Sequence, residues 1–150
     1  GANLSRANLT KASLHEVNLI GANLTGANLT GANLIGANLT RANLTEAILK
    51  RAHLYEARLN EADLTGANFS AANLYEANLF GATLYLADLS LANLTRANLN
   101  RAFIREADLS GALLIGAQLY EAILYEANIE GASFAGAGFT SLRGTRGVPR

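Results

Sequence analysis

The sequence predicts an all-β solenoid, a fold in which short extended segments stack in successive coils along one axis. Three observations predict it. A repeat of five residues runs through almost the whole chain, the apolar residues keep fixed positions within each repeat, and no segment has the periodicity of an amphipathic helix. Self-similarity at a short fixed period indicates a repeat architecture, in which each unit buries its apolar side against its neighbours.

The repeat stays in register from Gly1 to Thr140 and divides this segment into 28 blocks, which begin GANLS, RANLT, KASLH. The second position of a block is Ala in every block except the one that contains Val17. The third position is most often Asn, whereas the first and fifth positions vary. The fourth position is Leu except where another large apolar residue replaces it, at Phe69, Ile104, Ile129, Phe134 and Phe139.

A period of five residues excludes both a regular helix and a flat strand. Each residue of an α-helix turns by about 100°, so successive Leu side chains would lie about 140° apart and cover the whole helix surface. In a flat strand an odd spacing would send each new Leu to the opposite side. The chain must therefore turn a corner within each block. We expect the second and fourth positions to point inward, the third to point outward, and the fifth and first to form the bend.

The residues at the bend and on the outer surface allow two further expectations. Gly occupies many first positions, such as Gly21 and Gly26, and suits a sharp bend. Arg41 and Glu46 occupy the same position in other blocks, which indicates that the bend does not require a positive φ. Outward Asn side chains, such as Asn3 and Asn23, are expected to form amide ladders between coils.

The run A-N-L-T-G, repeated as A-(N/D)-L-x-x over nearly all of the chain, resembles the pentapeptide-repeat family. The resemblance implies a right-handed quadrilateral β-helix with four blocks per coil, and therefore about seven coils. Five-residue spacing alone would also permit a three-sided coil. Weak support for a period of 20 comes from Ser70, Ser90 and Ser110 and from Tyr55 with Tyr75. At a coil spacing of about 4.8 Å the rod would be about 34 Å long.

Two regions follow from the extent of the repeat. Residues 1–142 are assigned to the repeat domain, and residues 143–150 to a C-terminal tail. The tail contains Thr-Arg-Gly-Val-Pro-Arg, which resembles the remnant of a tag removed by a protease, so we expect it to lie outside the fold. The inward fourth positions form the expected core, which includes Leu14, Leu34, Leu54, Leu74, Leu94, Leu114, Phe69 and Phe134.

Composition argues against several classes of function. Twelve Lys and Arg residues balance twelve Asp and Glu residues, so no overall field attracts the chain to nucleic acid. Cysteine is absent, and we expect the two histidines, His15 and His53, to lie in one column two coils apart, so no metal site is predicted. No catalytic spacing or phosphate-binding loop is present, and a filled solenoid has no ligand-sized pocket. We therefore expect a protein with no enzymatic activity and no cofactor.

The localisation prediction depends on what the sequence lacks. No apolar run approaches the 18 or so residues of a membrane span, and Gly1–Ser5 lacks the charged and apolar regions of a signal peptide. We expect a soluble, cytoplasmic protein that does not bind membranes.

The outward positions indicate three candidate surfaces. An apolar contact face comprises Ile35, Tyr55, Tyr75, Leu91, Leu113 and Ile115, and it either binds a partner or stabilises neighbouring coils by cross-strand pairing. A neighbouring corner gathers Tyr85, Phe103, Ile123 and Tyr125. A third face carries acidic residues, namely Glu46, Asp88, Glu106, Asp108, Glu126 and Glu130, of which Glu106, Asp108, Glu126 and Glu130 form the candidate acidic site.

The predicted function is that of a protein-interaction or structural scaffold, with a protein partner that the sequence does not identify. An alternative comes from the family, because some pentapeptide-repeat proteins mimic duplex DNA and bind type II topoisomerases such as gyrase. Duplex DNA carries about one charge per 1.7 Å, so a mimic of this length needs on the order of 20 negative charges. Residues 1–142 carry twelve acidic and nine basic side chains, a net charge of −3. Mimicry is therefore the second choice.

A homodimer through the C-terminal coil is also expected. Large apolar residues gather where the repeats end, and a final coil must hide both its inner apolar layer and its unpaired edges. Two such ends could cover each other across a two-fold axis, and the family resemblance implies the same arrangement. A cap formed by the last residues is the alternative. The residues of the candidate dimer end are Ile123, Tyr125, Phe134, Phe139 and Leu142.

Overall fold

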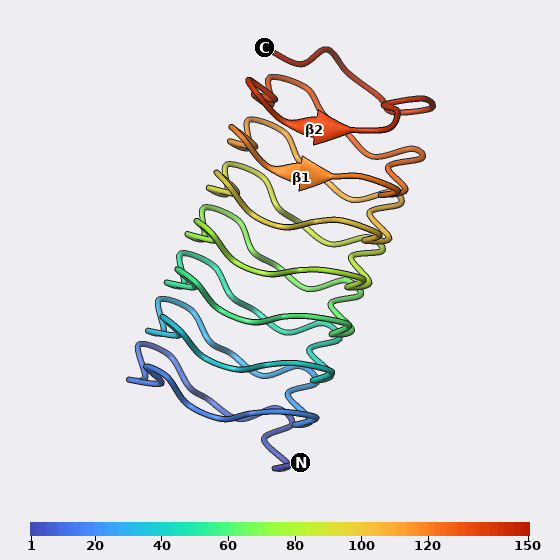
Figure 1. The fold of residues 1–150 in the computed structure, drawn as a ribbon. Helices are drawn as coiled ribbons and strands as arrows, with labels where there is room; N and C mark the ends of the chain where they lie inside the picture. The colour runs from blue at the N-terminus through green and yellow to red at the C-terminus, as the bar shows by residue number, and fades with distance from the viewer.

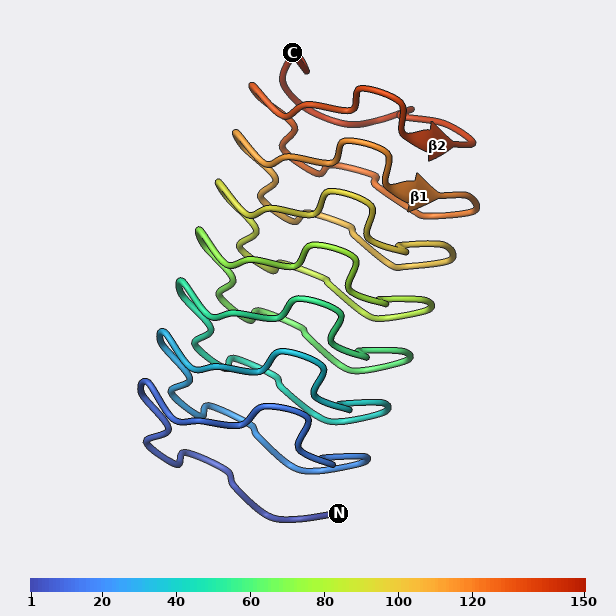
Figure 2. The same ribbon diagram turned by 60° about the vertical axis from the view of Figure 1, so that its left-hand side comes forward.

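The chain folds into a single rod of stacked coils with its two termini at opposite ends (Figure 1). The computed structural model describes residues 1–150. Parallel backbone bridges join residues 20 positions apart, as in Asn3 with Asn23 and Asn23 with Asn43. A step of 20 residues is four blocks, so each coil has four sides. Figure 2 shows the successive coils stacked along the rod.

The extended segments are very short because every block ends in a corner. Only the last coils contain strands longer than one residue, β1 (Gln118–Leu119) and β2 (Gly138–Phe139). They pair in parallel, with Gln118 opposite Gly138 and Leu119 opposite Phe139. Elsewhere each rung is a single bridge at the third position of a block. We name the four sides by the third position in the first coil: face A begins at Asn3, face B at Asn8, face C at Ser13 and face D at Asn18, and each continues every 20 residues.

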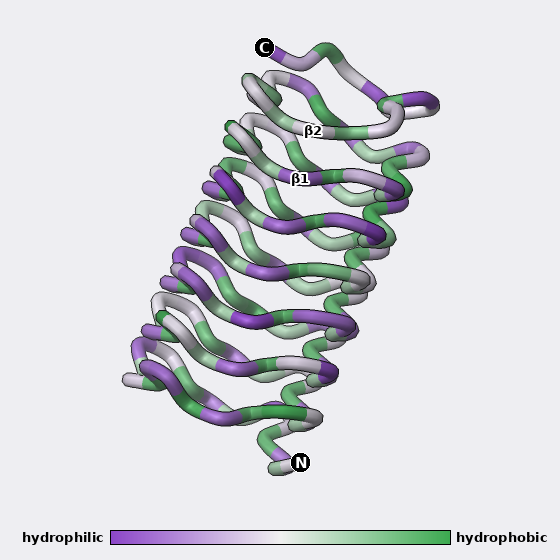
Figure 3. The backbone as a smooth tube through the Cα atoms, viewed as in Figure 1, coloured by the Kyte–Doolittle hydropathy of each residue, from purple (hydrophilic) through white to green (hydrophobic).

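The core fills the inside of the rod with the second and fourth positions of the blocks. All 45 buried residues are apolar and occupy these two positions, so the interior contains no polar side chain. Figure 3 shows the resulting alternation of hydrophobic and hydrophilic residues along the backbone. Leu14 and Phe134 are only partly buried, because the first and last coils are covered from one side. The other expected core residues are fully buried: Leu34, Leu54, Leu74, Leu94, Leu114 and Phe69.

The bends require a positive φ, and the expectation that they do not was wrong. Every first position from residue 6 to residue 136 is left-handed, including Arg41 at 57° and Glu46 at 56°. The amide of the following Ala donates to the carbonyl of the preceding Leu, as in Ala7 N to Leu4 O at 3.1 Å. This β-turn places the first position third of four, where type II turns need a positive φ. A side chain there costs about 1 kcal/mol, which burial of the neighbouring Leu and Ala offsets.

This conformation predicts the effect of substituting Gly21. An added Cβ at Gly21 would have no atom within 4 Å, so only the left-handed backbone opposes it. We expect Gly21→Ala to lower the free energy of unfolding by about 1 kcal/mol, measured by urea denaturation. Ala71→Gly is the reciprocal control, because Ala71 has a φ of 56° and should gain stability. Equal stability of Gly21→Ala and the parent would contradict the strain.

The outward Asn side chains serve the turns and do not form the expected ladders. The Asn23 Oδ1 atom accepts hydrogen bonds from the Thr25 amide at 3.0 Å and the Thr25 hydroxyl at 2.7 Å. The same arrangement recurs in most blocks that read Asn-Leu-Thr or Asn-Leu-Ser and in the block that reads Asn-Phe-Ser, and it is an Asx-turn. Only one bond joins Asn side chains of successive coils, from Asn93 Nδ2 to Asn73 Oδ1 at 3.4 Å. Two further Asn amides donate to a different residue type in the neighbouring coil, Asn128 to Asp108 and Asn100 to Gln118. The amide and hydroxyl donors within the same block lie closer to the Asn Oδ1 atom than the Asn amide of the next coil does. Most Asn side chains therefore bond within their own turn and form no ladder.

The C-terminal tail continues the stack, in contrast to the expectation that it lies outside the fold. Asn128 forms a parallel bridge with Arg146, and the amides of Glu126 and Ile129 donate to the carbonyls of Gly144 and Arg146, both at 2.7 Å. The Arg146 Nε atom donates to the Glu126 carbonyl at 3.0 Å. These bonds satisfy backbone groups of face B that would otherwise be left open. The tail therefore caps part of the last coil.

Candidate interaction surfaces

Half of the expected apolar contact face is occupied by contacts within the chain. Ile35, Tyr55 and Tyr75 are half-buried on face C, and the two tyrosine rings stack with centroids 5.6 Å apart. Arg96 donates from Nη1 to the Tyr75 hydroxyl and to Glu76 Oε1, each at 3.2 Å. Interaction with the Glu56 carboxylate raises the pKa of Tyr55. This column therefore joins neighbouring coils, as stacked cross-strand pairs do in sheets.

The other half of that face remains exposed in the fifth and sixth coils. Leu91 is 69% exposed at the corner between faces B and C, and Leu113 and Ile115 are also exposed on face C. A Cβ at Gly111 would lie 2.8 Å from Leu91 Cδ2, which shows that the Leu91 side chain lies over this glycine. This exposed cluster contains only Leu91, Leu113 and Ile115, because Tyr55 and Tyr75 in the coils below it are half-buried.

Face A carries the largest group of exposed apolar side chains. This group lies in the fifth to seventh coils, and the exposed fraction of its members is between 38% and 51%. The same columns hold only Asn, Asp, Thr, Ser, Gly, Arg and Glu in the first four coils. The sequence pattern indicated four of its five members but not Leu86, which joins the group only when the first positions of the blocks are aligned every 20 residues. We call this group the aromatic patch: Tyr85, Leu86, Phe103, Ile123 and Tyr125.

Arg105 lies within the aromatic patch. Its guanidinium carbon is 5.5 Å from the centroid of the Tyr125 ring, a cation–π contact. It forms no ion pair, unlike Arg101, whose Nε atom is 2.7 Å from Glu121 Oε2. The patch thus combines aromatic rings with one unpaired guanidinium.

The candidate acidic residues lie together, on face B and on the corner that joins it to face A. Glu106 and Glu126 occupy the corner, and Asp108 and Glu130 lie on face B. Asp108 Oδ1 accepts from the Ser110 amide at 2.9 Å and from Asn128 Nδ2 at 3.1 Å. Glu130 Oε2 accepts from the Val148 amide at 3.0 Å. None of the four carboxylates forms an ion pair.

The candidate dimer residues do not all lie at the end of the rod. Phe134 and Phe139 form an edge-to-face pair with centroids 6.1 Å apart, and Leu142 packs against the core beside them. Ile123 and Tyr125 lie on the side, within the aromatic patch on face A. Phe139, in β2, remains 38% exposed. The end surface is therefore smaller than the sequence suggested.

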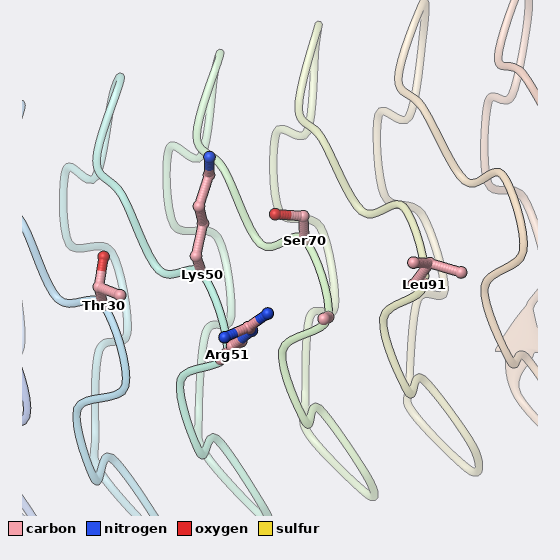
Figure 4. Close-up of a pocket in the computed structure, with 6 residues that line it drawn as sticks. Thr30, Lys50, Arg51, Ser70 and Leu91 are labelled. Atoms are coloured by element: carbon pink, nitrogen blue, oxygen red, sulfur yellow. The ribbon is translucent and has the colours of Figure 1, made fainter.

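The surface has one shallow hollow, which offers no catalytic arrangement (Figure 4). It is lined by Thr30, Lys50, Arg51, Ser70, Ala71 and Leu91. The hydroxyl hydrogens of Thr30 and Ser70 are already donated to Asn28 and Asn68.

The structure contains no group of three or more metal-ligating side chains. It also contains no helix with the length and hydropathy of a membrane span. The expectation that His15 and His53 share one column was wrong, because they occupy the fifth and third positions of face C.

Comparison with known proteins gives the family of this fold. The model of pentapeptide repeats matches residues 1–26, 22–60, 32–70, 72–111 and 104–145. The chain belongs to the pentapeptide-repeat family. Its fold is accordingly the right-handed quadrilateral β-helix that the family resemblance implied. No curated protein sequence matches the chain significantly.

Several solved pentapeptide-repeat proteins are similar to this chain. HetL, which is involved in heterocyst differentiation regulation in the cyanobacterium Nostoc, is 34% identical with a TM-score of 0.74 over 96% of this chain and 73% of HetL. A second Nostoc pentapeptide-repeat protein is 32% identical with a TM-score of 0.42 over 69% of this chain and 84% of its own. QnrB1, a plasmid-mediated fluoroquinolone resistance protein, is 18% identical with a TM-score of 0.47 over 98% of this chain and 75% of QnrB1.

Proposed function

We propose that this pentapeptide-repeat protein is a non-enzymatic scaffold that binds another protein through the aromatic patch. The observation that carries the proposal is the change along face A, from small polar side chains in the first four coils to exposed Tyr, Phe, Ile and Leu in the last three. The lower coils demonstrate that the fold does not need apolar residues at these outward positions. Folding of the last three coils therefore does not require the exposed Tyr, Phe, Ile and Leu side chains.

The composition of the aromatic patch fits a protein interface. Aromatic residues and Arg are enriched in the centres of such interfaces, and Tyr and Arg contribute a large share of the binding energy. Tyr85, Tyr125 and Arg105 supply these groups on a rigid surface whose backbone is fixed by the coil-to-coil ladder. A rigid surface loses little conformational entropy on binding.

The repeat itself provides the variants that test this proposal. Phe103→Asn and Tyr125→Thr restore the residues found at the same positions in lower coils, so the fold should be retained. We expect this double variant to lose at least tenfold in affinity for a partner captured from the source organism, because central aromatic residues each contribute 1 kcal/mol or more. Binding is measured by surface plasmon resonance with the purified partner. Ile20→Thr, at an exposed position of face D, is the matched control.

Two outcomes decide the result. Equal loss in the Ile20→Thr control and the patch variant would indicate unspecific adhesion, and full binding by the patch variant would remove the aromatic patch from the proposal.

DNA mimicry of a type II topoisomerase substrate is a second candidate. It is favoured by the four unpaired carboxylates of Glu106, Asp108, Glu126 and Glu130. The net charge of −3 over residues 1–142 opposes it, and so do Arg146 and Arg150, whose Nε atoms donate to carbonyls of the last coil. A supercoiling assay with purified gyrase separates the two functions, because only the mimic inhibits the enzyme.

A further inference from the structure

We propose that the aromatic patch, together with the acidic corner formed by Glu106 and Glu126, binds a basic amphipathic helix of a partner protein. The proposal rests on the protein-binding function proposed above and specifies the partner's chemistry. It follows from three features of the surface: the spacing of its columns, the free charges along its edge, and the position of Arg105.

The spacing of the coils suits a helix that lies parallel to the rod. Successive coils are about 4.8 Å apart, and successive turns of an α-helix are 5.4 Å apart. Over the three coils of the aromatic patch the two repeats differ by only about 1 Å, so each helical turn meets one coil. Apolar residues at i, i+3 or i+4 and i+7 of a helix would contact the columns of Phe103, Ile123, Tyr85 and Tyr125.

The edge of the patch determines the charge of the partner. Glu106 and Glu126 lie in the column that continues upward from Leu86, directly beside the apolar columns. Neither carboxylate forms an ion pair, and Asp108 adds a third negative charge just around the corner. Arg146 donates to the Glu126 carbonyl, so the negative field is strongest around Glu106 and Asp108. Lys or Arg residues flanking the apolar stripe of a helix would complement this edge.

Arg105 argues against a second copy of this chain as the occupant. Two face A surfaces related by a two-fold axis at the sixth coil would bring Arg105 against Arg105 and Glu106 against Glu106. Juxtaposed like charges oppose such a contact. A helix with an acidic or polar residue opposite Arg105 and basic residues along the corner avoids both conflicts.

The test uses synthetic 18-residue peptides and the full-length chain. A helical Leu/Lys peptide with an i, i+3, i+4, i+7 apolar stripe is compared by fluorescence anisotropy with a Leu/Glu peptide of the same pattern and with a Leu/Lys peptide interrupted by Pro. We expect the helical Leu/Lys peptide to bind at least tenfold more tightly than either control. Glu106→Gln with Glu126→Gln should weaken its binding about fivefold, as expected for two exposed ion pairs. Glu16→Gln with Glu46→Gln should leave binding unchanged.

Several results would overturn the proposal. Equal binding of the Leu/Glu peptide would remove the charge requirement, equal binding of the Pro-containing peptide would remove the helix, and equal loss in both pairs of Glu variants would indicate non-specific attraction. If the double variant Phe103→Asn with Tyr125→Thr bound the Leu/Lys peptide as tightly as the parent, the binding site would lie on another surface. If a captured natural partner still depended on Phe103 and Tyr125, the protein-binding function would stand and only the helix would be wrong.

Discussion

Replacement of Leu74 by Asp is expected to lower the free energy of unfolding by several kcal/mol. Leu74 lies in the fourth coil, is fully buried, and has Leu54 below it and Leu94 above it in the same inward column. An Asp at this position would place a carboxylate in an interior that contains no polar side chain and so offers it no side-chain partner. The loss of the buried Leu side chain adds about 2 kcal/mol. Chemical denaturation measures the effect.

The matched control is Thr95→Asp, an outward change in the next coil of the same face. Thr95 is half-buried and its amide is bonded to Asn93 Oδ1 at 3.1 Å. A carboxylate at the fifth position remains in contact with water, so we expect a change of less than about 1 kcal/mol. If Leu74→Asp unfolded at the same denaturant concentration as the parent, the assignment of inward and outward positions would be wrong.

Self-association through the end of the rod is the second large effect that we expect. The tail covers face B and the first residues of face C in the last coil, whereas the amides of Phe134 and Phe139 on faces C and D have no backbone acceptor. Phe139 in β2 is exposed beside these open groups. A second copy across a two-fold axis could cover both the ring and the open edge. We expect Phe139→Glu to weaken dimerisation by at least tenfold, because two carboxylates would face each other near the axis.

Sedimentation equilibrium of the parent, Phe139→Glu and Ile20→Glu measures this effect. Ile20 is exposed at the far end of the rod and controls for the added charge. A parent that is monomeric at every concentration would show that the tail alone completes the end. Dimerisation of Phe139→Glu with the affinity of the parent would place the contact on another surface.

The candidate surfaces were only partly predictable. Column alignment placed Tyr55 beside Tyr75, but it could not show that stacking half-buries these rings while Phe103 and Tyr125 stay exposed. The outcome depends on neighbours one coil away: Tyr75 has Arg96 to bond with, whereas Arg105 covers only one side of Tyr125. The exposure of an outward side chain depends on its neighbours in the coils above and below, so it cannot be predicted from a single block.

The sequence by itself determined the inside of this protein. Ala and Leu at fixed positions of a five-residue period can meet only if the chain bends in every block, so the core and the repeat boundaries follow from the residues. Only the tertiary structure decided the backbone conformation of the bends, the hydrogen-bond partners of the outward Asn side chains, and which residues cover the last coil. Arg41 and Glu46 adopt a left-handed backbone because closing the coil forces it, despite their intrinsic preference. The Asn side chains bond within their own turns, and residues 143–150 pair with the last coil, because backbone groups left open at that end require partners.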